Sequence, residues 1–433
     1  MAKKRIIILG AGLAGLSAAW HLKKRGIEAL VFEKEPEVGG LCRSKKINGF
    51  TFDYDGHLLH FRHRYTLNLL KKILGYNLIQ HKRSAWIYSH HSYIRYPFQA
   101  NLHRLPSSIA QECLLEYIHR DGHFKEKHKL NFAEWTNDTF GKGIARHFMF
   151  PYNAKFWTVS PEELNCDWVD GFIPVPSIDQ IIEGTIRESK RQFGYNAQFW
   201  YPQKGGINQI ALILAERLKN IRTNSEIIHI NFAKKEIDIS GGNREKYDYL
   251  ISTIPLPEIF RLAEGLPKEI IPEFKKLRWN SIFNFNIGID RKDESGMHWI
   301  YFPQNDVCFF RVGFFQNFSS HLVPKGKSAL YVEVAYSQHR PIDKVKIVLR
   351  IKGDLKKVRL LTSKDRIYSS DINDIKYGYP IYDKNYSVAR RAILEFLSRN
   401  DVVPCGRYGS WRYMSMEDAI LDGKKASELA REL

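Results

Sequence analysis

The sequence lacks the long apolar segments, paired cysteines and clustered histidines that mark several large classes of protein. None of its apolar runs approaches the roughly 18 residues of a membrane-spanning helix. Its five cysteines are scattered and form no Cys-x-x-Cys pair, which argues against a zinc site or a disulfide framework. The histidines show no ligand spacing, so we expect no metal. An odd number of cysteines without a signal-like leader is typical of the reducing cytosol, and we expect a cytoplasmic protein.

Acidic residues are in the minority, at 47 against 66 basic residues, which leaves a net charge of +19. Such a charge attracts phosphates, nucleotides or an anionic membrane surface. The densest basic stretch, 344–364, has helical apolar spacing; we interpret it as a core-facing helix with a solvated basic face, which leaves peripheral membrane contact open. No basic stretch is interleaved with aromatic residues, so we expect no nucleic-acid partner. No feature specifies an oligomeric state.

The chain is long enough for more than one lobe. With 433 residues it exceeds the size of a single small core, and we expect two or three lobes. Its first residues read as a strand over 5–9, a helix over 13–25 and a strand over 29–33. Helical spacing dominates from 65 to about 193, and strand-like alternation dominates from 281 to 337.

A glycine motif joins the first predicted strand to the first helix. Gly10, Gly12 and Gly15 form a G-x-G-x-x-G turn, which lets a pyrophosphate approach the helix N-terminus and the N–H groups of Leu13 and Ala14. A lone motif of this kind is weak evidence, because ordinary turns also contain glycines. Here Glu33 follows at the end of the second strand, where a carboxylate accepts hydrogen bonds from ribose hydroxyls. The combination favours a dinucleotide site.

The residues after Glu33 resemble the flavin fingerprint of the amine oxidase and protoporphyrinogen oxidase superfamily. Gly39, Gly40 and Arg43 match its glycine pair and basic residue, 248–255 matches its returning strand, and 405–407 matches the segment before its last helix. The resemblance implies FAD as the cofactor. It also implies further FAD contacts at Lys34, Leu41, Gly56, His57, Gly406, Arg407, Met416, Glu417 and Asp418.

Together these features predict an α/β fold with interleaved domains. The first is a discontinuous Rossmann-type FAD-binding lobe over 1–64, 201–262 and 403–433. The second is a mainly helical substrate-side insertion over 65–200. The third is an antiparallel β-sheet domain with flanking helices over 263–402.

Beyond the cofactor motifs, blocks over most of the chain resemble UDP-galactopyranose mutases, especially the eukaryotic type. The sequence matches that family in the same order at Asp55-Gly56-His57, 96–99, 152–157, 166–168, 196–206, 299–303, 310–311, 378–380 and 406–413. The resemblance implies a mutase that interconverts pyranose and furanose rings of a nucleotide sugar, in polysaccharide or glycoconjugate biosynthesis. Reduced FAD would attack the anomeric carbon through N5 and expel UDP. The sugar ring of the flavin–sugar adduct would then open and reclose at the other size, and the returning UDP would displace the flavin from the sugar.

The same resemblance implies roles for individual side chains. Arg311 would hold the diphosphate, with Tyr379 and Tyr413 as hydroxyl partners. His57 would lie at the flavin edge. Arg311 and His57 are thus the candidate catalytic residues, and the candidate substrate-binding residues are Trp157, Asn196, Trp299, Tyr301, Arg311, Tyr379 and Tyr413. The expected partner is a nucleotide sugar, most simply a UDP-sugar.

Three departures from the mutase pattern bear on the substrate. Phe172, in the segment Asp170-Gly171-Phe172, stands where the family has a second phosphate-binding arginine, and Phe318 stands where it has a tyrosine. The segment 414–418 replaces an asparagine-glutamine loop and is similar to a flavin contact of general amine oxidases. The alternative function is therefore an FAD-dependent oxidoreductase of the amine oxidase or protoporphyrinogen oxidase type. A third hypothesis is a non-enzymatic flavoprotein scaffold in a membrane-associated glycan assembly.

Overall fold

The nucleotide-binding part of the fold is built on a parallel sheet. The computed structural model describes residues 4–120, 130–189, 191, 193–194 and 196–432. β1 (Ile6–Leu9) lies between β2 (Ala29–Phe32) and β13 (Tyr249–Ser252), and the full strand order is β20-β13-β1-β2-β9. The outer strands are β20 (Val402–Pro404) and β9 (Ile221–Arg222). The apolar run IIIL is fully buried because a parallel sheet is covered on both faces.

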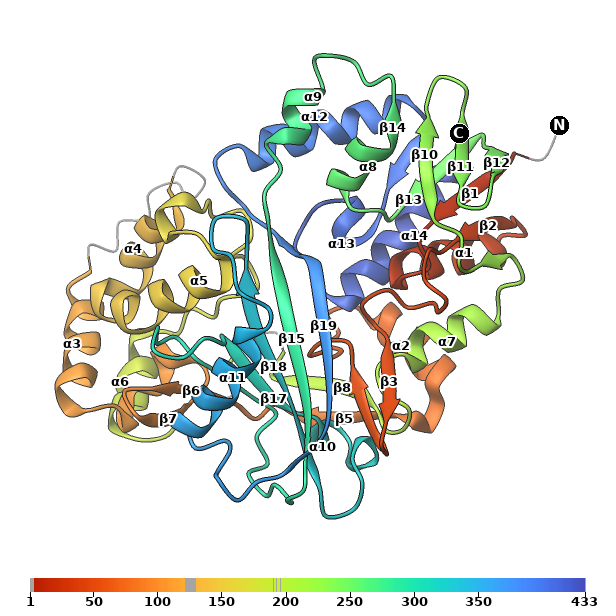
Figure 1. Ribbon diagram of the computed structural model, residues 1–433. Coiled ribbons are helices and arrows are strands. Elements are labelled where there is room, and N and C mark those ends of the chain that lie inside the picture. The colour runs from red at the N-terminus through yellow and green to blue at the C-terminus, as the bar shows by residue number, and fades with distance from the viewer. Residues whose placement is uncertain (1–3, 121–129, 190, 192, 195, 433) are drawn as a thin grey trace.

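Helices from both ends of the chain cover this sheet. α1 (Leu13–Lys24) follows β1 directly, as the glycine motif predicts, and α14 (Met416–Glu432) packs along it (Figure 1). A Cβ at Gly423 of α14 would lie 2.3 Å from the carbonyl oxygen of Ala14, so the two helices touch through their backbones. The other neighbours are α2 (Arg64–Leu74), α7 (Gln209–Glu216) and α13 (Gly406–Gly409).

A small sheet extends this lobe. Its order is β12-β11-β10-β14, with β10 (Ile227–Asn231), β11 (Glu236–Ile239), β12 (Asn243–Lys246) and β14 (Ala263–Glu264). α8 (Leu256–Leu262), α9 (Ile271–Lys275) and α12 (Tyr386–Arg399) lie beside it at the top of Figure 1. There are also two short antiparallel ribbons. One pairs β3 (Ser44–Ile47) with β4 (Phe50–Asp53), and the other pairs β5 (Leu78–Lys82) with β8 (Gln198–Pro202).

A seven-stranded sheet crosses the middle of the molecule, in the order β19-β15-β18-β17-β16-β6-β7 (Figure 1). Its strands are β15 (Trp279–Ile289), β16 (Trp299–Tyr301), β17 (Arg311–Phe314), β18 (Ser328–Tyr336), β19 (Ile367–Pro380), β6 (Ala85–Ser89) and β7 (Ser92–Arg95). β6 and β7 come from the segment 65–200, which the sequence predicts as mainly helical. The β-sheet is therefore larger than the sequence indicates.

A group of helices lies beside the seven-stranded sheet. α3 (Ser107–Ile118), α4 (Phe132–Ile144), α5 (Phe150–Trp157) and α6 (Ile178–Ile186) group at the left of Figure 1, and a π-helical turn over Ala145–Met149 joins α4 to α5. α10 (Phe315–Phe318) follows β17. α11 (Lys346–Lys357) lies in the basic stretch, and it buries Ile347, Ile351 and Leu355 as the spacing predicts. No helix within the described residues is long and apolar enough to span a bilayer.

Candidate active site

The glycine turn after β1 is closed on both sides by backbone and short side chains. Gly10 has φ of 95°, and a Cβ there would lie 2.2 Å from Oγ1 of Thr253. A Cβ at Gly15 would lie 2.0 Å from the carbonyl oxygen of Gly10. Only glycine fits at both positions, so the turn is as tight as a pyrophosphate-binding turn requires.

The N-terminus of α1 is open to an anion. Its N-cap is Gly12, no side chain accepts from the first N–H groups, and the first turn holds no acidic residue. Unsatisfied N–H groups and the helix dipole attract a phosphate there. Glu33 is buried beside this turn, with Oε2 accepting from the N–H of Ala11 at 2.7 Å and Oε1 from the N–H of Glu35 at 3.0 Å. The residues present therefore fit the phosphates and a ribose of FAD.

A second glycine turn lies against the first. The N–H of Gly39 donates to the carbonyl of Ala11 at 2.8 Å. Arg43 donates from Nε to the carbonyl of Gly40 at 2.8 Å and pairs with Glu35 at 3.0 Å. Arg43 therefore holds the turn in place, and Leu41 lies between Gly40 and Arg43 in the sequence. Lys34, in contrast, has a side chain that is 64% exposed.

The C-terminal segment completes the cofactor side. Gly406 has φ of 77°, and a Cβ there would meet Cβ of Ala14 at 2.6 Å, which places Gly406 against the first turn of α1. Glu417 is 1% exposed and accepts from the N–H groups of Arg62 and His63 at 2.8 and 3.0 Å. Asp418 pairs with Arg62. The carboxylates predicted to contact FAD thus anchor the segment before α2, while Met416 begins α14.

Five tyrosines from five segments meet beyond the glycine turns; we call them the tyrosine cluster. They are Tyr96, Tyr152, Tyr301, Tyr379 and Tyr413. Tyr301 lies 5.5 Å from Tyr96 and 5.3 Å from Tyr152 between ring centroids, and Tyr379 stacks on Tyr413 at 5.4 Å. The guanidinium of Arg407 lies over Tyr379 at 5.0 Å and over Tyr413 at 5.7 Å. Stacked phenols with a cation above them suit a flat or sugar-like ligand that carries negative charge.

His57 lies in the loop after β4, near this cluster. Its Nδ1 is 2.9 Å from the carbonyl oxygen of Asp55, so Nδ1 carries the proton and Nε2 is left as an acceptor. Burial, followed by the charges of Arg407 and Arg311, lowers the pKa of His57 to about 4. The imidazole is therefore neutral at physiological pH.

Arg311 rises from a buried strand, as its sequence context predicts, but it already has a partner. Its Nε and Nη2 both donate to Glu333 on the neighbouring strand, with Nη2 to Oε1 at 2.6 Å. Glu333 is 0% exposed. Burial, and then the charge of Glu333, raises the pKa of Asp55 well above its usual range. The candidate diphosphate-binding cation is thus part of a buried charge cluster of Arg311, Glu333 and Asp55, which we call the Arg311 trio.

The two predicted tryptophans lie behind the site. Trp157 is 0% exposed and lies 6.1 Å from Tyr379 and 6.4 Å from Tyr413, ring to ring. Trp299 is 1% exposed and stacks on Phe318 at 6.3 Å. Both indoles are buried and pack against tyrosines of the cluster, Trp157 against Tyr379 and Tyr413, and Trp299 against Tyr301 at 6.4 Å between ring centroids.

Asn196 is joined to the cluster through an arginine. Arg83 donates to Oδ1 of Asn196 and to the carbonyl of Phe193, and its guanidinium lies over Tyr96 at 4.8 Å. The amide of Asn196 is therefore held in place by Arg83 at the edge of the tyrosine cluster.

Sequence reasoning missed Glu333 and left Asp55 without a role. Glu333 is the one charged residue in the apolar stretch Ala329–Tyr336, as Arg311 is between Val307 and Phe315. Each charge lies alone in a buried strand, and buried charges need partners. That rule predicts a buried acidic partner for Arg311, but it does not predict the strand register that supplies the partner.

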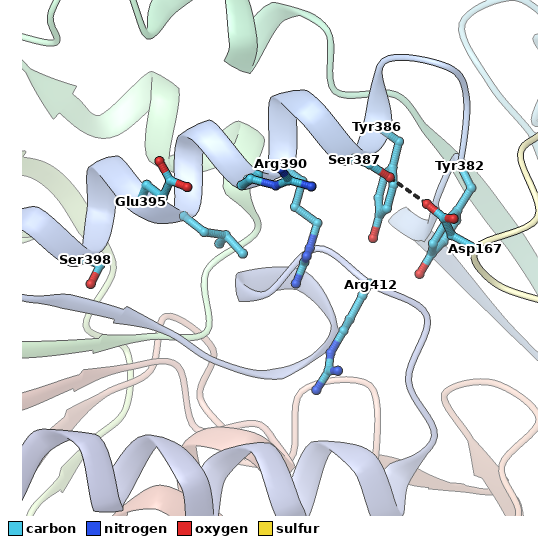
Figure 2. Close-up of a pocket in the computed structure, with 10 residues that line it drawn as sticks. Asp167, Tyr382, Tyr386, Ser387, Arg390, Glu395, Ser398 and Arg412 are labelled. Atoms are coloured by element: carbon cyan, nitrogen blue, oxygen red, sulfur yellow. Dashed lines mark hydrogen bonds between the residues drawn. The ribbon is translucent and has the colours of Figure 1, made fainter. Parts of the chain in front are cut away.

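A separate pocket of about 590 Å³ is lined by residues of α12 together with Asp167, Tyr382 and Arg412 (Figure 2). The hydroxyl of Tyr382 accepts from the N–H of Tyr413 at 2.6 Å, so the pocket adjoins the loop that carries Tyr413. Arg390 donates to the carbonyl of Ser410, and Arg412 pairs with Asp422 at 3.0 Å. These cations are engaged by the protein, so the pocket is a basic surface feature outside the tyrosine cluster. Over the described ranges, no group of three or more His, Cys, Asp or Glu side chains is placed to hold a metal ion.

Comparison with protein families gives one match that spans nearly the whole chain. The model for flavin containing amine oxidoreductases matches residues 13–430. A 4,4'-diapophytoene desaturase (4,4'-diapolycopene-forming) of a Methylomonas species is 26% identical over 392 residues, 76% of this chain and 73% of the desaturase. Protoporphyrinogen oxidase 2 of Arabidopsis thaliana is 48% identical, but only over 50 residues, or 12% of this chain and 10% of that protein.

The solved structures differ more clearly in how well they superpose on this chain. Reduced UDP-galactopyranose mutase superposes with a TM-score of 0.94 and 28% identity, over 99% of this chain and 96% of the mutase. A putrescine oxidase bound to putrescine superposes with a TM-score of 0.65 and 15% identity, over 99% of both chains, which shows only that the fold is shared.

Proposed function

Because this chain belongs to the flavin-containing amine oxidoreductase family and is an FAD-dependent enzyme of its UDP-galactopyranose mutase-like branch, we propose that it interconverts the pyranose and furanose rings of a UDP-sugar. The main support for this proposal is the TM-score of 0.94 to reduced UDP-galactopyranose mutase over nearly all of both chains. The drop to 0.65 for a putrescine oxidase supports the mutase branch over an amine oxidase activity.

In this proposal the glycine turns and Glu33 hold FAD, with Arg43 and Gly406 fixing the turns around it. Reduced FAD supplies an electron-rich nitrogen nucleophile for the anomeric carbon. The protein positions the sugar beside it, and Tyr301 and neutral His57 are suitably placed to contact sugar hydroxyls. Nε2 of His57 is an acceptor, so it can hold a hydroxyl proton in place.

The diphosphate is assigned to the cationic side of the tyrosine cluster. Arg407 lies over Tyr379 and Tyr413, and Arg311 lies on the neighbouring side of the cluster. Phenol hydroxyls and guanidinium groups stabilise a departing diphosphate most strongly where water is excluded. Asn196 is a candidate for a further polar contact. The reaction would serve polysaccharide synthesis from cytoplasmic nucleotide sugars.

A second candidate function is an FAD-dependent oxidoreductase. The desaturase that matches 76% of this chain favours it, as does the pairing of Arg311 with Glu333, which reduces the positive charge available to a diphosphate. In that case the tyrosine cluster would hold an organic substrate from which electrons pass to the flavin.

One experiment separates the two functions. The purified yellow protein is divided, one half is reduced with dithionite under nitrogen, and both halves receive a panel of UDP-hexopyranoses. We expect ring-contracted product only from the reduced half, and no hydrogen peroxide from the oxidised half in air. Turnover by the oxidised half with peroxide formation would instead support the oxidoreductase.

A further inference from the structure

The Arg311 trio brings two carboxyl groups and one guanidinium together inside the protein. Arg311 on β17 lies opposite Glu333 on β18, and both oxygens of Glu333 accept from that guanidinium. Asp55 is 8% exposed and Glu333 is 0% exposed. One cation therefore serves two buried acids, and two anions beside one cation would leave an uncompensated charge.

The hydrogen bonds of Asp55 indicate which acid holds a proton. Oδ1 of Asp55 accepts from the N–H of Gly56 at 2.8 Å and faces Nδ2 of Asn284 at 3.5 Å. Both oxygens of Glu333 are committed to Arg311. Burial, and then the charge of Glu333 and a side-chain hydrogen bond with it, raise the pKa of Asp55 well above its usual range, so the proton of the pair belongs on Oδ2 of Asp55. The trio is then neutral overall, with one guanidinium, one carboxylate and one carboxylic acid.

The other titratable groups around the trio do not change this balance. Tyr152 on α5, Tyr331 on β18 and Tyr379 on β19 are phenols whose burial raises their pKa, so they stay neutral. His57 is neutral because burial lowers its pKa to about 4. Arg407 already donates to the carbonyl of Met414 at 3.0 Å and stacks on the tyrosines. Tyr301 on β16, Tyr408 on α13 and Tyr413 lie in the same surroundings, and burial raises the pKa of Tyr408 and of Tyr413.

We propose that Asp55 and Glu333 together take up about one proton from solvent when an anionic ligand binds, and that Glu333 is a positioning residue that holds Arg311 until then. This rests on the proposed function, in which the ligand is the diphosphate of a UDP-sugar. A diphosphate that pairs with Arg311 removes the cation from Glu333. A diphosphate that binds only the remaining Nη1 adds negative charge beside Glu333. In both cases a proton neutralises the buried carboxylate, and it returns to solvent when the ligand leaves.

Proton uptake on binding makes the affinity for the ligand fall as the pH rises. A ligand whose binding takes up about one proton binds about tenfold more weakly for each unit rise in pH, wherever the bound pair of carboxyl groups holds both protons and the free pair holds only the proton of Asp55. UDP should therefore bind more tightly at acidic than at alkaline pH. Glu333 thus couples ligand charge to protonation, a role that packing alone would not produce.

Isothermal titration of UDP into the oxidised, FAD-loaded enzyme tests this directly. Titrations at one pH in HEPES and in Tris, which differ in ionisation enthalpy and contain no phosphate to compete with UDP, give the number of protons exchanged. We expect an uptake of about one proton per UDP for the wild type. The same uptake is expected for Arg391→Ala, which removes the guanidinium of an exposed arginine that lines the separate pocket. The double variant Asp55→Asn/Glu333→Gln should bind UDP with almost no uptake.

The outcomes separate this inference from the proposed function. UDP binding to the wild type without proton uptake contradicts the coupling but leaves the mutase proposal standing, and this measurement needs no variant to fold. An uptake that persists in the double variant also contradicts the coupling. A wild type that does not bind UDP at all contradicts both.

Discussion

Arg311 lies on a strand of buried apolar residues and meets Glu333 on the next strand. Replacement of Arg311 by Met leaves the Glu333 carboxylate buried without a cation, which costs about 3–5 kcal/mol of unfolding free energy. Arg311→Met/Glu333→Gln removes both charges and should recover most of that loss. UDP affinity should stay low in both variants. Denaturant unfolding and UDP titration measure the two effects, and equal stability losses in both variants would contradict the ion-pair assignment.

His57 provides a prediction in the acid range. Its pKa is about 4 in the folded protein, so the unfolded chain takes up the proton near the usual value of about 6.5 and the folded chain only near 4. The free energy of unfolding should therefore fall as the pH drops from about 6.5 to 4. His21, His60 and His298 share this direction. His57→Gln should make the fall shallower, and an unchanged slope in pH-dependent denaturant unfolding would contradict the buried neutral state.

The sequence predicts some site residues far better than others. Gly10, Gly15 and Glu33 follow from local spacing, because one turn and one strand bring them together. Arg311 follows from its apolar context and the family resemblance. The partner of Arg311 does not, because Glu333 faces it only through the register between β17 and β18, and neither strand contains a local signal for that register.

The turn between β1 and α1 should lose its affinity for FAD when a side chain is added at Gly10. Gly10→Ala should cost about 1–3 kcal/mol in backbone strain and displace the hydroxyl of Thr253. We expect FAD to bind at least about tenfold more weakly. The flavin absorbance per protein after desalting measures this. Gly353→Ala on α11 is the matched control, because a Cβ there meets no atom within 4 Å. Full flavin content in Gly10→Ala would contradict the assigned turn.

The loop between β16 and β17 is held by a lysine on α5. Nζ of Lys155 is buried and donates to the carbonyls of Phe302 at 2.9 Å and Val307 at 3.1 Å, and also to Gln304 and Phe309. Lys155→Met leaves these carbonyls unpaired and should lower the free energy of unfolding by about 3 kcal/mol. Because this loop leads into Arg311, UDP affinity should also fall. A thermal unfolding curve identical to the wild type would contradict the role.

The elements missed from the sequence share a physical cause. The long strand β19 buries Ser369 and Asn373 on its inner face, and Asn373 accepts from Lys45 at 2.9 Å. Since its inward residues include polar ones, the apolar alternation that reveals a strand is weak. β6 does alternate, but it is short and lies in a segment that otherwise has helical spacing. Its partner β16 is distant in sequence. Such strands form because they pair with distant strands in the folded protein, and the local sequence does not predict that pairing.

At the scale of the molecule, the cofactor side is assembled from the beginning, middle and end of the chain. β1 pairs with β13, β13 pairs with β20, and α14 covers α1 (Figure 1). The sequence indicates this interleaving because cofactor-type motifs occur in all three segments. The substrate side is harder to predict, because the tyrosine cluster draws one residue from each of five segments. Only the family resemblance predicts that Tyr301, Tyr379 and Tyr413 belong to one site.

In the proposed function, this FAD-dependent enzyme rearranges a sugar ring without net oxidation. The most direct test incubates the reduced enzyme with UDP-galactopyranose in one reaction and with UDP-galactofuranose in another, and follows both reactions by chromatography. We expect both reactions to reach the same mixture of the two sugars, with no electron acceptor consumed. The proposed function would be contradicted if neither sugar were converted, or if an oxidised product formed with matching consumption of an acceptor.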